Sequence, residues 1–158
     1  MIVAWTGHRP DVFDAPLVAR TAVQEAAAEL HSSATRFLMG GQRGVDTWAA
    51  LAAISLGLPF ALILPCPPER FRADWSAEDR ATLDHTLRHA ISVEVAHGYT
   101  ERNRRLAVSA GLLVAVWTGT RGGGTEETIG FARGAGVPVH EIRLRPANGA
   151  ELLRGRGI

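Results

Sequence analysis

The chain has 158 residues, about the length of one domain, and its 46% hydrophobic and 21% charged residues are ordinary for a globular protein. All 17 basic residues are arginine, so the sequence excludes mechanisms that need a Schiff-base lysine or a P-loop lysine. The net charge of +1 gives no reason to expect tight attachment to nucleic acid or to a membrane surface. Cys66 is the one cysteine, and no Cys/His cluster has metal-binding spacing, so we expect no metal and no bound cofactor.

The N-terminus lacks the pattern of a signal peptide, and no apolar run approaches the ~20 residues that span a bilayer. We therefore expect a cytoplasmic protein without a membrane partner. Residues 1–146 read as one domain, and residues 147–158 have the composition of a C-terminal tail.

Short apolar runs alternate with longer helical patterns along the chain. The runs predict strands at residues 2–5, 36–39, 60–64, 91–95, 112–117 and 137–142. The helical patterns cover residues 12–31, 44–56, 69–88, 100–110 and 125–135. The segment 69–88 is polar enough to form one broken helix or two short ones. Gly57 and Gly136 end the helices that precede them, and Thr125 is a plausible N-cap.

This alternation predicts an α/β protein with a Rossmann-like, doubly wound, mostly parallel sheet of about six strands and helices on both faces. The run 112–117 is apolar throughout, as a strand covered on both faces requires. With the strand order 3-2-1-4-5-6, ligands would bind beyond the carboxyl ends of the strands, near the switch between the first and fourth. Four loops with unusual sequences, after the first, second, fourth and fifth strands, would meet there.

The first two of these loops combine glycines with donor side chains. In the loop 6–10, Gly7 allows close approach of the backbone to a ligand, and its polar neighbours suit phosphate or ribose. The loop 40–46 has three glycines before a helix start, which resembles a phosphate cradle. Asp46 would either favour the positive end of that helix or hold a ribose hydroxyl. Each of these loops has a structural turn as its alternative interpretation.

The other two loops also lead into helices. The loop 97–105 places three arginines near a helix start, where Arg102 and Asn103 lie nearer the expected crevice than their neighbours. The loop 118–128 has consecutive glycines before Glu126 and Glu127, which would hold sugar hydroxyls or act as ordinary first-turn acids. Trp117 ends a strand and would pack in the core or stack on a base.

These loops supply all the candidate ligand-binding residues. They are Thr6, Gly7, His8, Arg9, Gly41, Gln42, Arg43, Gly44, Asp46, Tyr99, Asn103, Trp117, Gly123, Gly124, Thr125 and Glu126, with Arg102 and Glu127 as candidate catalytic residues.

The order and spacing of these motifs resemble those of the SLOG superfamily of Rossmann-like nucleotide-ligand proteins, especially its YpsA-like, phage-associated branch. The resemblance rests on the segments 6–10, 41–46, 99–103, 115–125 and 136–139. It implies binding of a nucleotide or nucleotide derivative, AMP-like or ADP-ribose-like. A homodimer would be the expected assembly, since most soluble homo-oligomers are symmetric dimers.

Two relatives of that superfamily suggest alternatives. Lonely Guy-type phosphoribohydrolases cleave the N-glycosidic bond of nucleoside monophosphates, and Arg102 and Glu127 occupy the positions of their arginine and glutamate. The turn 117–121 is two residues longer than theirs, so the resemblance supports ligand binding more directly than turnover. The DNA-processing protein A family binds single-stranded DNA. The near-neutral charge of this chain and its lack of an aromatic series argue against the same function here.

Overall fold

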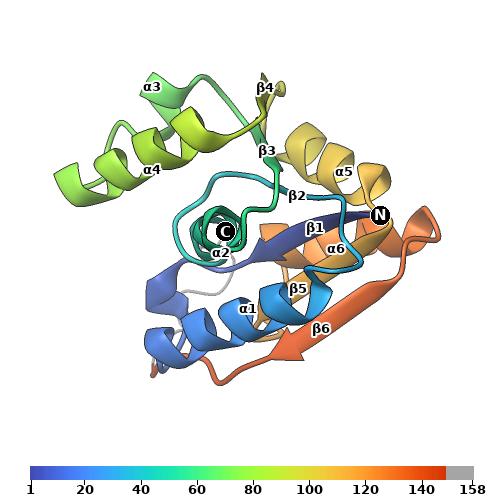
Figure 1. The fold of residues 1–158 in the computed structure, drawn as a ribbon. Coiled ribbons are helices and arrows are strands. Elements are labelled where there is room, and N and C mark those ends of the chain that lie inside the picture. The colour runs from blue at the N-terminus through green and yellow to red at the C-terminus, as the bar shows by residue number, and fades with distance from the viewer. Residues whose placement is uncertain (149–158) are drawn as a thin grey trace.

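The six predicted strands form one parallel sheet in the computed structural model, which describes residues 1–148 (Figure 1). The strands are β1 (Ile2–Gly7), β2 (Arg36–Met39), β3 (Phe60–Leu64), β4 (Ser92–Val95), β5 (Leu112–Trp117) and β6 (Val139–Arg143). The helices are a short 3-10 turn η1 (Pro10–Val12), α1 (Pro16–Leu30), α2 (Val45–Leu56), α3 (Pro68–Phe71), α4 (Ala77–His89), α5 (Tyr99–Ser109) and α6 (Gly124–Gly134). The predicted Rossmann-like α/β class is confirmed.

The strand order corrects the expected one. It is β4-β3-β2-β1-β5-β6, so β4 pairs with β3 at the sheet edge and β5 takes the place beside β1. The switch between the two halves of the sheet therefore lies between β1 and β5, where Trp5 pairs with Val114. After β4, α5 crosses back and packs against β3 and β1. This crossing brings the loop after β4 to the switch point, although the strand itself lies at the far edge.

Alternate residues of the central strands enter two separate cores. On one face, Val3 and Trp5 pack with buried residues of α1, α2 and α4. On the other face, Ala4 packs with buried residues of α5 and α6, among them Leu106 and Ile129. The period of two along a strand produces this division, and it explains why the central strands are apolar throughout. Trp5 is fully buried and meets Phe37 edge to face, with ring centroids 5.1 Å apart, so it is a core residue.

The first helix begins later than the helical pattern suggested. The segment predicted as one helix from residue 12 is η1 followed by α1, and Pro16 occupies the first turn of α1. A proline disfavours helical backbone in the residue before it, and its missing N–H is harmless at a helix start. Ala15 accordingly has non-helical backbone angles. The predicted end of α2 is confirmed, since Gly57 adopts the left-handed conformation with φ +67°.

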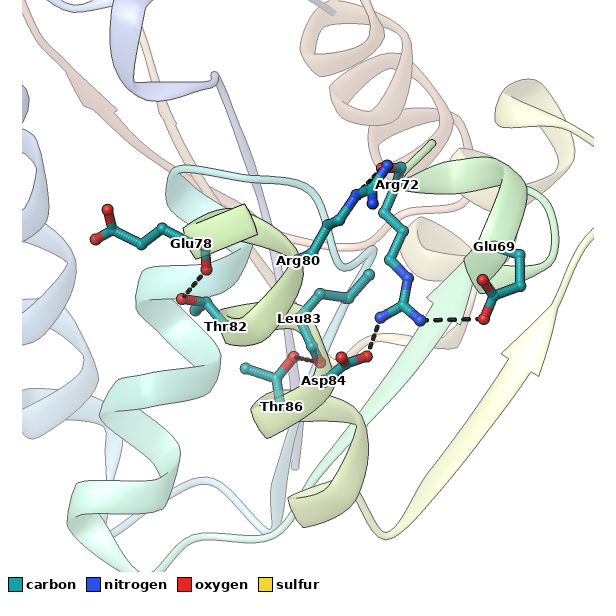
Figure 2. Close-up of polar contacts among 8 residues, drawn as sticks. All are labelled: Glu69, Arg72, Glu78, Arg80, Thr82, Leu83, Asp84 and Thr86. Carbon is teal, nitrogen blue, oxygen red and sulfur yellow. Dashed lines mark hydrogen bonds and ion pairs between the residues drawn. The ribbon is translucent and has the colours of Figure 1, made fainter. Parts of the chain in front are cut away.

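The segment 69–88 contains two short helices, one of the two expected arrangements. Figure 2 shows how their junction is held: the Arg72 guanidinium pairs with Glu69, at 3.0 Å, and with Asp84 of α4. The Arg80 side chain donates a hydrogen bond back to the Arg72 carbonyl oxygen (Figure 2) and a second one to the Ala73 carbonyl oxygen. These contacts fix α3 relative to α4.

The end of the described chain returns to the start of the fold. Pro146 forms an isolated antiparallel bridge with Phe13, and the Ala147 N–H donates to the Val12 carbonyl at 2.9 Å. Apart from Ala147 and Asn148, the predicted tail 147–158 lies outside the described residues. Within residues 1–148, no helix is long and apolar enough to cross a membrane.

Candidate functional site

A pocket of about 190 Å³ lies at the carboxyl edge of the sheet, between the start of α5 and the start of α6. All four loops singled out from the sequence contribute to it. Its lining consists of Thr6, Gly7, Gln42, Asp46, Tyr99, Thr100, Arg102, Asn103, Leu106, Gly122, Gly123, Gly124, Thr125 and Glu127. Eleven of these fourteen residues were predicted as site residues, and the fold gathers them at the switch point of the sheet.

The floor of the pocket is formed by the end of β1. Thr6 is 8% exposed and Gly7 follows it between β5 and α2. A Cβ atom at Gly7 would stand 2.3 Å from the Val116 carbonyl oxygen and 2.4 Å from a methyl carbon of Val45. This position therefore admits glycine alone without a shift of β5 or α2, which is the close backbone approach expected from the sequence.

Arg102 enters the pocket wall from the first turns of α5 and is 6% exposed. Its Nη1 donates to the Gly40 carbonyl at 2.6 Å, and its Nε donates to Asn103 Oδ1 at 2.8 Å. A Cβ atom on Gly40 would lie 2.2 Å from Nη1, so the absence of a side chain there makes room for the guanidinium. Within residues 1–148, no ion pair joins Arg102 to a carboxylate.

Asp46 lies in the first turn of α2 and is also buried. Its Oδ2 accepts a hydrogen bond from the Gln42 N–H at 3.1 Å, which closes the glycine-rich loop onto the helix. Burial raises the pKa of the Asp46 carboxyl to about 6, against the opposing effect of the Arg102 charge and of backbone hydrogen bonds. Burial likewise lowers the pKa of the Arg102 guanidinium, an effect that the Asp46 charge partly offsets. The two groups thus belong to one electrostatic unit.

Glu127 reaches the pocket from α6 and is held by two residues of α5. Its Oε1 accepts a hydrogen bond from Asn103 Nδ2 at 3.0 Å, and its Oε2 accepts one from the Thr100 hydroxyl at 3.3 Å. Thr100 and Asn103 are three positions apart and therefore share one face of α5. The carboxylate is thus held between the two helices, in the pocket that Arg102 also lines.

The glycine turn at the start of α6 forms the remaining wall. Gly123, in extended conformation, is the N-cap of α6, so the prediction that Thr125 would cap the helix is wrong. Thr125 lies inside the first turn and is 4% exposed. Glu126 turns back on its own loop, where it accepts the Gly122 N–H at 3.0 Å and pairs with Arg121 at 3.6 Å. Glu126 therefore serves the turn and does not line the pocket.

Six other predicted site residues also lie outside the pocket lining: His8, Arg9, Gly41, Arg43, Gly44 and Trp117. His8 is buried and hydrogen-bonded to Thr118. The Arg43 guanidinium lies over the Trp75 ring, 4.7 Å from its centre, and lines a different hollow between α1, α2 and α4. Trp117 is buried and donates its indole N–H to Glu141 at 2.9 Å.

Two of these residues, Gly41 and Gly44, shape the loop after β2. Both have positive φ, +80° and +87°, and a Cβ atom on Gly44 would lie 2.3 Å from the His8 carbonyl oxygen. The Val45 N–H donates to that same carbonyl at 3.2 Å. These glycines hold the loop after β2 against the loop after β1, behind the pocket.

Three lining residues were missed from the sequence: Thr100, Leu106 and Gly122. The signal for Thr100 was its spacing of three from Asn103, which places both side chains on one helix face. Leu106 extends the same face by a further turn. No metal site accompanies the pocket, since residues 1–148 contain no group of three or more His, Cys, Asp or Glu side chains that could hold a metal ion.

No protein-family model and no curated protein matches the sequence. Solved structures do match. The chain is similar to DNA processing protein A from Streptococcus pneumoniae, with 17% identity, a TM-score of 0.68, and coverage of 88% of this chain and 49% of that one. It is also similar to DNA processing protein A from Helicobacter pylori, with 16% identity, a TM-score of 0.68, and coverage of 97% and 71%. The molybdenum cofactor carrier protein from Chlamydomonas reinhardtii gives 22% identity, a TM-score of 0.65, and coverage of 96% and 80%.

The shared architecture decides the fold. It is a Rossmann-like α/β fold with a parallel six-stranded sheet. The chain spans about half the length of the Streptococcus structure. The structure from Helicobacter pylori is described as showing a unique single-stranded DNA binding mode. Structures with this fold include a DNA-processing protein and a cofactor carrier, so the ligand of this chain must be argued from its own pocket.

Proposed function

We propose that this protein binds a nucleotide or nucleotide derivative, AMP-like or ADP-ribose-like, in the pocket between α5 and α6. One observation carries the proposal. The buried guanidinium of Arg102, which makes no ion pair within residues 1–148, lines the same pocket as the glycine turn that begins α6. The Asp46 charge offsets only part of the effect of burial on Arg102, and a helix N-terminus favours an anion, so the pocket suits an anionic ligand.

The Glu127 carboxylate favours a ligand that carries a sugar next to its phosphate. Glu127 accepts two hydrogen bonds from α5 and retains acceptor capacity for a sugar hydroxyl. A phosphate bound at the glycine turn would place its ribose beside this carboxylate. The volume of about 190 Å³ is smaller than the ~300 Å³ at which fully enclosing ligand pockets begin, so the base would project outward. Tyr99, half exposed at the pocket rim, offers a ring against which a base can stack.

Titration calorimetry with AMP and ADP-ribose tests this proposal. The variant Arg102→Gln removes the buried charge and should weaken binding by about 10- to 100-fold, because hydrogen bonds to charged groups contribute ~1.5–3 kcal/mol. Arg105→Gln is the matched control on the same helix. Arg105 is directed away from the pocket and pairs with Glu94 and Glu101, so this variant should bind like the wild type. Absence of binding of either nucleotide to the wild-type protein would refute the proposal.

A second candidate function is hydrolysis of the N-glycosidic bond of a nucleoside monophosphate. The observation that favours it is the position of Glu127, whose carboxylate is fixed in the pocket that Arg102 also lines. In this reaction Glu127 would stabilise positive charge at the anomeric carbon, and Arg102 would orient the phosphate. The longer turn 117–121 does not exclude Glu127 from the pocket, contrary to what two extra residues would suggest.

Base release from AMP, followed by chromatography, separates the two candidates. If the protein is a hydrolase, Glu127→Gln should abolish base release and leave AMP affinity within a few-fold of the wild type. If it is a binding protein, the wild type should release no base above the uncatalysed rate.

Binding of single-stranded DNA is less well supported by the arrangement of the arginines. Arg105 is neutralised by two glutamates, and Arg43 lies over Trp75, outside the pocket. Neither of them lines the pocket with Arg102. An oligonucleotide affinity that falls steeply with salt concentration would nevertheless favour DNA over the small ligand. A homodimer and a cytoplasmic location remain part of the proposal, and sedimentation velocity tests the dimer.

A further inference from the structure

The strongest unexplained feature of the pocket is the way Asn103 joins its two charged groups. Its side-chain Oδ1 accepts from Arg102 Nε at 2.8 Å, and its Nδ2 donates to Glu127 Oε1 at 3.0 Å. Asn103 is 6% exposed, and its bond to Arg102 is buried while its bond to Glu127 is partly buried. The two partners have opposite charges, and an amide offers an acceptor to one and a donor to the other. This arrangement fixes the orientation of the amide.

The same geometry fixes Glu127. One carboxylate oxygen is bound by Asn103 and the other by Thr100, both from one face of α5. Glutamate has three rotatable side-chain bonds, and a single contact would leave much of that freedom in place. Two donors from a neighbouring helix restrict the carboxylate to one position. Its remaining lone pairs then have a defined direction in the pocket.

We propose that Asn103 and Thr100 are positioning residues that hold Glu127 as an acceptor for the 2′-hydroxyl side of a bound sugar, and thereby make the pocket selective for ribonucleotides over 2′-deoxyribonucleotides. The inference rests on the proposed nucleotide function. Arg102 and the glycine turn bind the phosphate of either sugar, so they supply affinity without discrimination. Glu127 supplies the discrimination, and it does so only while α5 holds it in place.

The matching substitutions act on the two supporting bonds separately. Asn103→Asp preserves the shape but replaces the donor toward Glu127 with a second carboxylate, which repels it and pairs with Arg102. Thr100→Val preserves the shape of an exposed residue and removes the hydroxyl. Thr82→Val is the control: Thr82 lies on α4, and its hydroxyl bonds to the Glu78 carbonyl of its own helix (Figure 2).

The test is the ratio of the dissociation constants for 2′-deoxy-AMP and AMP, measured by calorimetry for the wild type and the three variants. A lost hydrogen bond to a charged acceptor changes affinity by about tenfold or more, so we expect a wild-type ratio of at least about 10. Thr82→Val should keep that ratio. Thr100→Val should reduce it to about 3, and Asn103→Asp should bring it close to 1. If Asn103 and Thr100 had a purely structural role, their substitution would weaken the binding of both nucleotides equally and leave the ratio of dissociation constants unchanged.

Each outcome has one meaning. A wild-type ratio near 1, or a ratio that both variants preserve, overturns the inference and leaves the proposed nucleotide binding intact. Failure of the wild type to bind either nucleotide overturns the proposed function itself, and the inference with it. If Asn103→Asp does not fold, Thr100→Val decides alone, because its side chain is exposed and its replacement leaves no buried group unsatisfied.

Discussion

The buried carboxylate of Asp46 should give this protein an unusual dependence of stability on pH. Its pKa in the folded protein is about 6, against an ordinary value of 3.8, because burial disfavours the charged form. The folded state therefore holds the Asp46 proton more tightly than the unfolded state between about pH 4 and pH 6. Stability from this group is fully present below pH 4 and is lost as the pH rises through 6. The shift of the Asp46 pKa corresponds to about 3 kcal/mol of unfolding free energy, at ~1.36 kcal/mol per pKa unit.

The substitution Asp46→Asn isolates this effect. An asparagine does not titrate, and its side-chain oxygen can still accept the Gln42 N–H that Asp46 accepts at 3.1 Å. The difference in unfolding free energy, variant minus wild type, should increase by about 2 kcal/mol between pH 4 and pH 7, because pH 4 already lies slightly above the ordinary pKa of 3.8. Other titrating groups affect both proteins alike and cancel in the difference.

Urea denaturation at four pH values between 4 and 7 measures the difference directly. The control is Asp11→Asn, since the Asp11 side chain is 66% exposed and lies outside the pocket. Its difference from the wild type should stay within about 0.5 kcal/mol throughout. A flat difference for Asp46→Asn, or one that decreases with rising pH, would refute the reasoning that burial dominates over the attraction of Arg102.

Three further predictions follow from the same pocket and its surroundings. The affinity for sulfate, whose charge is constant between pH 5 and pH 7, should increase several-fold in the wild type as the pH falls from 7 to 5, because protonation of Asp46 removes the charge that opposes Arg102. In Asp46→Asn the affinity should stay constant, and calorimetry measures both. Gly40→Ala should weaken AMP binding at least tenfold, since its Cβ would lie 2.2 Å from the Arg102 guanidinium, whereas Gly134→Ala, with open space around it, should bind normally. Arg72→Gln should lower the unfolding free energy in urea by about 1 kcal/mol, and a loss above 3 kcal/mol would contradict the view that this partly exposed ion pair is modest.

The sequence contains most of the fold because its local signals agree with one another. The ranges predicted for β2, β3 and β5 match the structure, since each is an apolar run bounded by turn residues. The position of β4 could not be obtained in this way. All four of its residues are exposed, and pairing with β3 instead of β1 depends on where α5 packs, which no local pattern records. The Rossmann order is a sound expectation that long-range packing overrode.

For the site too, local features predicted which residues take part, whereas the contacts between those residues depend on long-range packing. Residue type and loop position were enough to select Arg102, Asn103 and Glu127 as candidates, because ligands of such sheets bind beyond the carboxyl ends of the strands and these loops carry polar side chains there. Their mutual contacts were not foreseeable, since Asn103 and Glu127 are 24 positions apart and meet only when α5 packs beside α6. Conversely, Glu126 was selected on the same grounds as Glu127 and serves its own turn. Adjacent residues on a helix point about 100° apart, and here Glu127 faces the pocket while Glu126 is bonded to its own turn.

The partners of the arginines explain why a chain of net charge +1 can still present a site for an anion. Arg72, Arg105 and Arg133 each pair with carboxylates at the surface, where solvent screens the interaction and little field remains. Arg102 is the opposite case: it is buried, its hydrogen-bond partners are the neutral groups of Gly40 and Asn103, and the Asp46 charge offsets only part of the effect of its burial. A charge in such surroundings attracts an anion more strongly than several exposed ones, because the low local dielectric preserves its field. The capacity to bind an anion therefore depends on the burial and partners of one arginine, and the sum of the charges is no guide to it.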